Sequence, residues 1–316
     1  MDNILITGGA GFIGSHLAER LLRQGKRLAI VDDLDDYYPA DLKRANLDEI
    51  KASGEFQFFP ADIRNGEKLR QVFTTFKPDA VIHLAARPGV RMSFAQPEAY
   101  TSINVLGTTQ VLETSRQSGV RRWVFASSSS VYGDSSRAPF REDAVIAHPL
   151  SIYAATKVAG EAVAFTYSHA YDLSVVCLRF FTAYGPRQRP DLAIRKFADM
   201  IMEGKEIPIF GDGSLQRDYT YIEDIIDGTL LALDAPGKFD VFNIGNAHPV
   251  RIDEMVDTLG HALGQPVRKK FIPTPAGEMI VTHADLTKAS QILGYSPKVS
   301  FGEGIRRFAE WLKSRG

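Results

Sequence analysis

Over its first 180 residues the chain alternates short runs of β-branched and aromatic residues with longer stretches in which apolar positions recur every three or four residues. The short runs predict strands and the longer stretches predict helices. Such alternation favours right-handed βαβ units, so we predict an α/β fold of Rossmann type, a doubly wound parallel sheet with helices on both faces. The expected strands are Asn3–Thr7, Arg27–Asp32, Phe56–Pro60, Ala80–Leu84, Trp123–Ser127 and Ser174–Phe180, and the expected helices include Ile13–Gln24, Glu67–Phe76, Pro97–Ser118 and Tyr153–Tyr171.

The rhythm changes after about residue 181, where proline and glycine interrupt the chain, as at Gly185-Pro186 and Gly211-Asp212-Gly213. Short mixed strands and helices of this kind indicate a smaller mixed α/β lobe. In a parallel sheet of the predicted type, ligands bind beyond the carboxyl ends of the strands. We therefore expect a Rossmann domain over residues 1–180, with returning segments near 223–250 and 283–290, and a substrate-binding lobe interleaved with it over residues 181–316.

The composition mainly excludes classes of function. A net charge of −1 in 316 residues argues against a nucleic-acid partner, because no basic excess is available to neutralise phosphates. No apolar run approaches the roughly 18 residues of a membrane span and no leader precedes the first strand, so we expect a cytoplasmic protein without a membrane partner. The single cysteine, Cys177, lies in an apolar run and should be buried. None of the seven histidines has paired metal-ligand spacing, and no metal site is predicted.

The first expected strand runs directly into the glycine-rich turn Thr7-Gly8-Gly9-Ala10-Gly11-Phe12-Ile13-Gly14, and an expected helix follows at once. Glycine permits the tight turn and lets the backbone approach a pyrophosphate, while the helix N-terminus offers free amides to the anion. The flanking strand and helix supply the context that a chance glycine repeat would lack. The turn therefore predicts a dinucleotide cofactor held by Gly8, Gly11, Phe12, Ile13 and Gly14.

Three further strands end in residues that suit the same cofactor. Asp32-Asp33 follows the second strand, about 20 residues beyond the glycines, where a carboxylate accepts from ribose hydroxyls and repels a 2′-phosphate; NAD is therefore favoured over NADP. Asp62-Ile63 after the third strand is a candidate adenine contact, or else a strand-end turn. Leu84-Ala85-Ala86 after the fourth strand offers small residues where the cofactor must pass, or is an ordinary apolar strand end.

Tyr153 and Lys157 lie four residues apart at the start of an expected helix, so their side chains share one face. A phenol titrates near pH 10, and an ammonium within reach stabilises the phenolate. The pair predicts acid/base chemistry, although a tyrosine and a lysine at this spacing also occur by chance as a packed ring beside a solvated charge.

These motifs, with Ala126-Ser127-Ser128-Ser129-Ser130-Val131-Tyr132-Gly133 between them, make the chain similar to the extended short-chain dehydrogenase/reductase family over essentially its whole length. Within that family it most resembles nucleotide-sugar 4-epimerases, above all UDP-glucuronate 4-epimerases. The resemblance implies that NAD stays bound while a UDP-sugar is inverted at C4 through a 4-keto intermediate. It also implies that Tyr153 is the base, that Lys157 lowers its pKa and binds the nicotinamide ribose, and that Ser128, or alternatively Ser130, binds the reacting hydroxyl.

The resemblance also implies a set of substrate-binding residues. Arg217 would bind the UDP pyrophosphate, and Thr182, where many relatives carry asparagine, would leave room for a bulkier group at C5. A 4-keto glucuronate is a β-keto acid that loses CO₂ readily, so its carboxylate must be held, and a planar guanidinium suits this task. Arg189 is the first candidate clamp and Arg87 and Arg91 are the next, with Ser129 also placed near the sugar. Pro275-Ala276-Gly277-Glu278 lacks the second arginine that many 4-epimerases use on the pyrophosphate.

Three other functions compete with this one. A UDP-glucose 4-epimerase would use the same chemistry on a neutral sugar. A UDP-glucuronate decarboxylase is disfavoured because such enzymes tend to place a glutamate in the serine loop, and dehydratases carry an Asp-Glu pair where this chain has Ser129-Ser130. An NAD-binding redox sensor is disfavoured by the intact Tyr153 and Lys157. The family further implies a homodimer formed by helices near Pro97–Ser118 and Tyr153–Tyr171.

Overall fold

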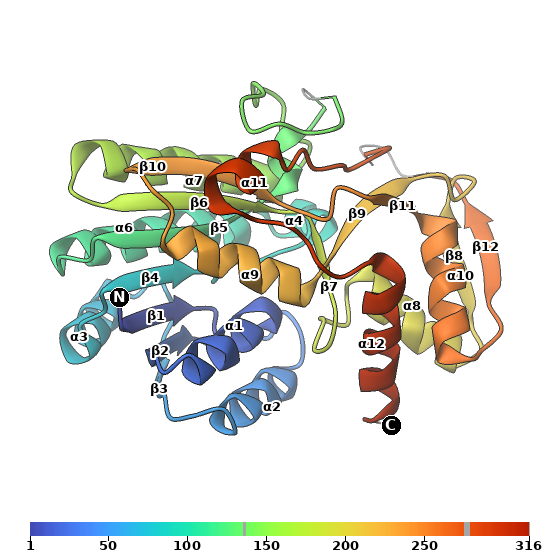
Figure 1. Ribbon diagram of the computed structural model, residues 1–316, viewed down its shortest axis with the longest axis horizontal. Coiled ribbons are helices and arrows are strands. Elements are labelled where there is room, and N and C mark those ends of the chain that lie inside the picture. The colour runs from blue at the N-terminus through green and yellow to red at the C-terminus, as the bar shows by residue number, and fades with distance from the viewer. Residues whose placement is uncertain (135–136, 275–278, 316) are drawn as a thin grey trace.

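The computed structural model describes residues 1–134, 137–274 and 279–315, and its centre is a seven-stranded sheet (Figure 1). The strand order is β10-β6-β5-β4-β1-β2-β3, and every neighbouring pair is parallel. This confirms the predicted Rossmann-type sheet. The strands are β1 (Asn3–Thr7), β2 (Arg27–Asp32), β3 (Gln57–Pro60), β4 (Ala80–His83), β5 (Arg122–Ser128), β6 (Ser174–Phe180) and β10 (Phe239–Ile244).

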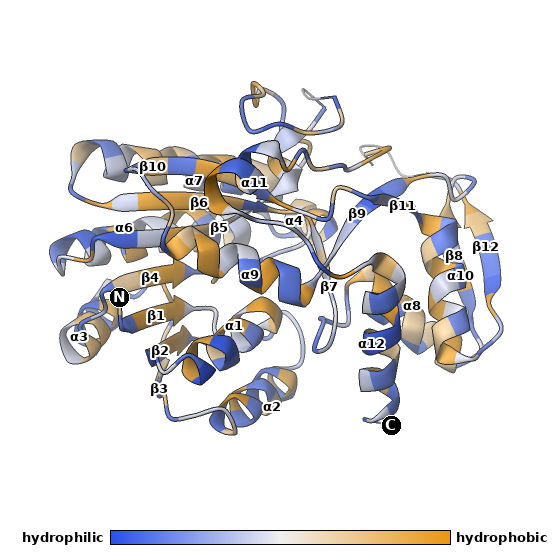
Figure 2. Cartoon of the chain, viewed as in Figure 1, coloured by the Kyte–Doolittle hydropathy of each residue, from blue (hydrophilic) through white to orange (hydrophobic). Residues whose placement is uncertain are grey.

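Helices cover both faces of this sheet because alternate strand residues point to opposite sides. In β1, Ile4 and Ile6 enter one core while Leu5 enters the other. The first core includes apolar residues of α1 (Phe12–Arg23), α2 (Ala40–Lys51) and α9 (Ile222–Leu233), and the second those of α3 (Gly66–Phe76), α6 (Thr108–Gln117) and α7 (Ile152–Ala170). Figure 2 shows apolar strands between helices that carry both apolar and polar residues.

The prediction of one continuous helix over Pro97–Ser118 is wrong. The structure divides it into α5 (Pro97–Thr101), a π-helical segment η1 (Ser102–Gly107) and α6, after a separate short helix α4 (Val90–Ala95). A π segment widens the turn, and the i, i+3, i+4 apolar spacing does not reveal it. The widened turn carries Asn104, whose amide bonds both the backbone N–H and the carbonyl of Arg87, at 2.7 and 2.9 Å.

Segments after residue 181 form the smaller part of the structure and also return to the large sheet through α9, β10 and α11 (Thr287–Leu293). Two small sheets complete it, with orders β11-β9-β7 and β12-β8. Within the described residues, no helix combines the length and apolar character that crossing a membrane requires. The remaining elements are η2 (Ser129–Tyr132), β7 (Thr182–Tyr184), α8 (Ala193–Met202), β8 (Glu206–Phe210), β9 (Gln216–Tyr221), β11 (Pro249–Arg251), α10 (Ile252–Leu263), β12 (Arg268–Ile272) and α12 (Phe301–Lys313).

Candidate active site

A cavity of about 450 Å³ opens at the carboxyl ends of the large sheet's strands, where the crossovers from β1 and β4 diverge to opposite sides. Its size lies within the range of small-molecule sites. Most residues singled out from the sequence line it. They are Gly8, Gly11, Phe12, Ile13, Gly14, Asp32, Asp33, Asp62, Ile63, Leu84, Ala85, Ala86, Arg87, Ser128, Ser129, Ser130, Tyr153, Lys157, Thr182 and Arg189.

The glycine turn is packed so closely that side chains are excluded from it. A Cβ on Gly14 would lie 2.3 Å from the Gly8 carbonyl oxygen, and a Cβ on Gly8, whose φ is +74°, would lie 2.7 Å from the Ala85 nitrogen. The first turn of α1 carries neither a side-chain cap nor an acidic residue. Its free amides and positive helix end therefore face the cavity and suit an anion such as a pyrophosphate.

Asp32 is held rigidly at the end of β2. Its Oδ2 accepts from the Ala10 N–H at 3.1 Å and its Oδ1 from the Leu34 N–H at 2.9 Å. Burial raises the pKa of this carboxyl, and the ammonium of Lys43, 3.9 Å away, acts in the opposite direction. The cavity thus has a fixed acceptor about where the ribose hydroxyls of a dinucleotide would lie.

Tyr153 and Lys157 lie together on the first turns of α7, with the lysine Nζ 5.9 Å from the tyrosine ring centroid. Burial raises the pKa of Tyr153, and the groups that oppose this shift are Ser128, through a hydrogen bond, and Arg189, through its charge. Lys157 instead donates to the Ala126 carbonyl at 2.6 Å, and burial lowers its own pKa to about 8.

The four consecutive serines at the end of β5 all line the cavity. Ser127 donates to Glu161 at 2.5 Å, and Glu161 also pairs with Arg179. The Ser128 hydroxyl acts on the pKa of Tyr153 through a hydrogen bond. It also accepts from the Ser130 N–H at 3.2 Å and so caps the start of η2. Of the serines considered from the sequence, Ser128 is the one whose hydroxyl acts on the pKa of Tyr153.

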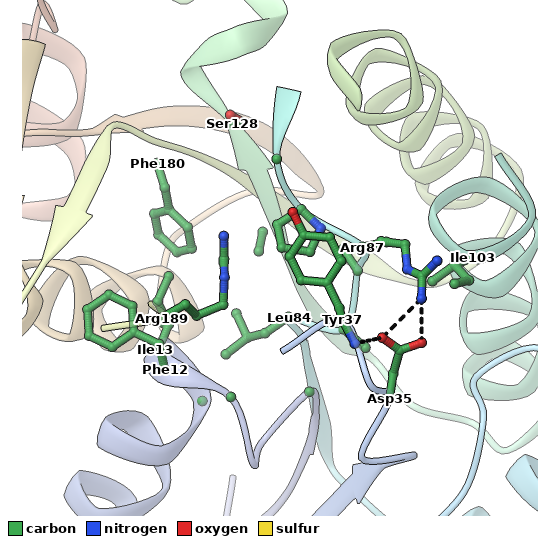
Figure 3. A pocket seen from close by; sticks show the side chains of 18 of the residues that line it. Phe12, Ile13, Asp35, Tyr37, Leu84, Arg87, Ile103, Ser128, Phe180 and Arg189 are labelled. Atoms are coloured by element: carbon green, nitrogen blue, oxygen red, sulfur yellow. Dashed lines mark hydrogen bonds and ion pairs between the residues drawn. The ribbon is translucent and has the colours of Figure 1, made fainter. Parts of the chain in front are cut away.

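Arg189 projects into the cavity from the loop after β7, as Figure 3 shows. Its Nε and Nη2 bind the two oxygens of Asp191 at 2.9 and 3.0 Å, so both N–H groups of Nη1 and the second N–H of Nη2 are left for a ligand as far as the described residues go. The guanidinium also lies over the ring of Tyr37, 5.8 Å from its centroid. Thr182, on β7, lines the same cavity.

Arg187, two residues before Arg189, points away from the cavity and anchors this loop. Its φ of +63° is left-handed, and its side chain is almost fully buried against α1 and α2. It bonds Glu19 at 2.6 Å, Glu49 at 3.3 Å and His16 Nδ1 at 2.7 Å. His16 Nε2 donates to the Pro186 carbonyl at 2.9 Å, and burial together with Arg187 lowers the pKa of His16 to about 3, so this ring is neutral.

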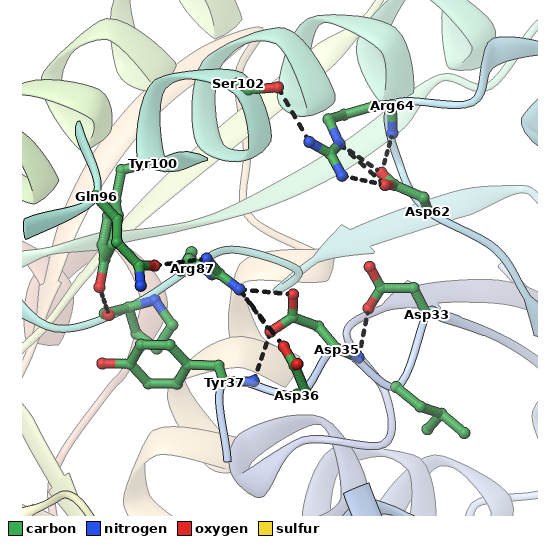
Figure 4. A network of polar contacts seen from close by, with 12 residues as sticks. Asp33, Asp35, Asp36, Tyr37, Asp62, Arg64, Arg87, Gln96, Tyr100 and Ser102 are labelled. Atoms are coloured by element: carbon green, nitrogen blue, oxygen red, sulfur yellow. Dashed lines mark hydrogen bonds and ion pairs between the residues drawn. The ribbon is translucent and has the colours of Figure 1, made fainter. Parts of the chain in front are cut away.

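Arg87 is already engaged by the protein. Its Nη2 bonds the oxygens of Asp35 at 3.2 and 2.9 Å, and its Nη1 bonds Gln96 at 2.8 Å (Figure 4). Its Nε is buried without a hydrogen-bond partner among the described residues. Arg87 is therefore a weaker candidate than Arg189 for binding a substrate carboxylate.

Asp62 also has a protein partner. Arg64 Nε lies 3.0 and 2.9 Å from its two oxygens, and this ion pair lowers the pKa of the carboxyl. Arg64 in turn donates to Ser102 on η1 at 3.2 Å (Figure 4). Asp62 lines the cavity, but its carboxylate is oriented by Arg64.

Two arginines singled out from the sequence lie outside this cavity lining. Arg91 on α4 lies over the ring of Phe210 at 4.8 Å, and Arg217 on β9 donates to the carbonyls of Gln216 and Met279, both at 2.8 Å. The departure from the family pattern at Pro275-Ala276-Gly277-Glu278 falls outside the described residues.

Several lining residues were not anticipated. Asp35, Tyr37 and Tyr38 come shortly after Asp32-Asp33, so their position after the second strand could have identified them as cavity residues. Lys43 lies inside α2, and no periodic pattern distinguishes a buried lysine there from an exposed one. Phe180 at the end of β6, with Phe181 and Leu192 beyond it in the sequence, also lines the cavity.

Comparisons with known proteins agree with this geometry. The model of the family described as GDP-mannose 4,6 dehydratase matches residues 5–308. The chain is 41% identical over 314 residues to a UDP-glucuronate 4-epimerase of Thermodesulfobacterium geofontis (strain OPF15), covering 99% of this chain and 97% of that protein. It matches the crystal structure of the Bacillus cereus UDP-glucuronic acid 4-epimerase in complex with UDP-glucuronic acid and NAD with a TM-score of 0.92, 37% identity and 99% of both chains covered. A Thermotoga maritima UDP-glucose 4-epimerase with UDP-glucose gives a TM-score of 0.91 at 31% identity, with 99% of both chains covered.

Proposed function

This chain belongs to the GDP-mannose 4,6 dehydratase family of extended short-chain dehydrogenases/reductases, and from that membership we propose that it is an NAD-dependent 4-epimerase that converts UDP-glucuronate to UDP-galacturonate. The observation that carries the proposal is one cavity in which Tyr153, Lys157 and Ser128 meet the guanidinium of Arg189. The first three are an acid/base group. The arginine adds a cation that a carboxylate-bearing sugar needs and a neutral sugar does not.

The residues present fit NAD. The glycine turn leaves no room for side chains, the uncapped start of α1 suits the pyrophosphate, and the fixed carboxylate of Asp32 suits a ribose without a 2′-phosphate. Asp33, Asp62, Ile63, Leu84, Ala85 and Ala86 would complete the binding site. When bound, NAD would accept a hydride from C4 of the sugar and return it to the opposite face.

Tyr153 is the proposed general base for the C4 hydroxyl, and Ser128 would hold that hydroxyl in line with it. A raised phenol pKa demands help for deprotonation, and the positive charges of Arg189 and Lys157 lie where they can supply it. Lys157 is also placed to bind the nicotinamide ribose. On the return step the protonated Tyr153 would give the proton back, so the reaction is balanced without any net oxidation.

Arg189 is the proposed holder of the C5 carboxylate. Asp191 fixes its guanidinium, which therefore presents Nη1 to the cavity without needing to be ordered first. A carboxylate held in one orientation can be kept from the perpendicular arrangement in which the 4-keto acid loses CO₂. Thr182 and Ser129 would lie near the same end of the sugar, whereas Arg217 would bind the UDP pyrophosphate beyond the cavity lining.

The proposal extends to assembly. Leu106 on η1 and Phe165 on α7 are each half exposed, and Asn104 links these two helices through a 3.0 Å hydrogen bond to Thr156. Two half-exposed apolar side chains on these neighbouring helices support the expected homodimer. We also propose that residues 1–180 with the returning segments bind NAD, that the remaining chain binds the UDP-sugar, and that the protein acts in the cytoplasm.

The test is to incubate the purified protein with NAD and either UDP-glucuronate or UDP-glucose and to identify products by NMR. UDP-galacturonate is the expected product. UDP-galactose as the single product would show that the protein acts on the neutral sugar, an alternative that the similarity to the Thermotoga maritima enzyme supports. UDP-xylose or a 4-keto pentose would mean decarboxylation, and the absence of any product would favour a redox sensor.

A further inference from the structure

Two loops of the cavity are joined by an ion pair whose position in the sheet is informative. Asp35 follows β2 and Arg87 follows β4, and these strands are the two neighbours of β1. The glycine turn follows β1 itself. A bond between the loops after β2 and β4 must therefore pass over the end of β1, above the turn on which a dinucleotide would lie.

The pair is built as a fixed structure. Asp35 Oδ1 also accepts from the Tyr37 N–H at 2.8 Å, which orients the carboxylate toward Arg87. On the other side Asn104 holds the Arg87 backbone from both its N–H and its carbonyl, and Gln96 holds Nη1. The Arg87 side chain is 15% exposed and that of Asp35 27% exposed, so water screens this pair less than it screens a surface pair.

Tyr37 extends the same contact toward the sugar end of the cavity. In Figure 3 its ring stands between Arg87 and Arg189, and each guanidinium carbon lies 5.8 Å from the ring centroid. The loop after β4 approaches so closely that a Cβ on Gly89, whose φ is +95°, would lie 2.5 Å from the Tyr37 hydroxyl. The segment from Asp35 to Tyr37 thus touches the loops on both sides of it.

We propose that Asp35 and Arg87 form a clasp across the cofactor cavity that holds the dinucleotide between turnovers and must open for it to exchange. This inference rests on the proposed function, because an epimerase that removes and restores one hydride needs its reduced cofactor to remain bound. The clasp makes Asp35 a positioning residue. It sets the rate at which dinucleotide leaves, and it takes no part in the proton or hydride transfer.

The chain offers a matched pair of variants. Asp35→Asn keeps an oxygen for the Tyr37 N–H but loses the charge that binds Arg87. Asp36→Asn removes the same charge one residue further on, from a side chain that is 99% exposed and 4.0 Å from Arg87. Both variants have the same net charge, so long-range attraction of the dinucleotide is equal in the two proteins.

The experiment measures the decay of bound-NADH fluorescence after each protein, loaded with NADH, is diluted into excess NAD. Because the charge-assisted bond that closes the clasp is lost, release from Asp35→Asn should be about tenfold faster than from the wild type. Asp36→Asn should stay within about twofold of the wild type. Equal release rates in all three proteins would overturn the clasp.

Two further measurements keep the test decisive. If Asp35→Asn does not fold, Gln96→Ala loosens Arg87 from the other side and should still speed release by about threefold, the effect of one lost hydrogen bond. An unchanged rate for Gln96→Ala would then count against the clasp. A wild type that holds neither NAD nor NADH would overturn the proposed function itself, whereas a wild type that retains NADH but is insensitive to Asp35 would overturn the clasp alone.

Discussion

Replacing Arg189 by methionine tests the choice of sugar directly. Methionine keeps an unbranched apolar stem and removes the guanidinium, while the partner left behind, Asp191, is 39% exposed and can be hydrated. The lost contact is one charge-assisted hydrogen bond from Nη1 to the substrate carboxylate, about 1.5–3 kcal/mol. At 1.4 kcal/mol for each factor of ten, kcat/KM for UDP-glucuronate relative to UDP-glucose should fall about 10- to 100-fold.

The ratio between the two sugars is the quantity to measure. Arg189 also lowers the pKa of Tyr153 through its charge, so its loss slows the reaction of both sugars, and this common effect cancels in the ratio. A coupled assay or NMR time course with each UDP-sugar at several concentrations supplies both values. Arg195→Met is the control, since Arg195 pairs with Asp199 at 3.0 Å on α8 and does not line the cavity. A ratio unchanged in Arg189→Met would refute the assignment.

Three further outcomes follow from the site and from the anchor of its loop. Tyr153→Phe should lower kcat about 100- to 10,000-fold, the usual contribution of a general base, with an unaltered circular dichroism spectrum; near-normal turnover would exclude Tyr153 as the base. Lys157→Met should be more stable than the wild type near pH 7, and its advantage should shrink between pH 8 and 10.5, because burial lowers the pKa of Lys157 from 10.5 to about 8 and the unfolded chain binds the extra proton in that window. Urea unfolding at pH 7 and pH 10 checks the sign. The wild type should lose stability as the pH falls from 6.5 toward 3, since the folded His16 resists protonation, and His16→Gln should lose less over that range; parallel pH profiles would contradict this.

The sheet and the glycine turn could be predicted because residues close together in the sequence determine both. Apolar strand residues such as Ile4 and Ile6 recur with a period of two. The Gly8 carbonyl lies so close to Gly14 that only glycine fits there. Tyr153 and Lys157 share a helical face for the same local reason. Motif order then sufficed to indicate the family.

What could not be predicted depends on contacts between distant segments. The burial of Lys43 is decided by how α2 lies against the loop after β2, and the pairing of Arg87 with Asp35 joins residues 52 positions apart. The raised pKa of Tyr153 is likewise outside the reach of sequence, because desolvation outweighs the charges near it and desolvation is a property of the folded cavity. The π segment at η1 likewise leaves no periodic signature.

The anchor at Arg187 has a consequence for redesigning the sugar preference. Exchanging only the residues that face the ligand would ignore what positions the loop after β7. His16 and Glu19 hold this loop through Arg187, and both belong to α1, the helix whose N-terminus faces the proposed phosphate site. A loop grafted from a relative would keep its geometry only if both of these partners and Glu49 of α2 were transferred with it. Residues 185–191, the first two turns of α1 and Glu49 are therefore best exchanged together, because varying the loop against fixed partners would displace its arginines.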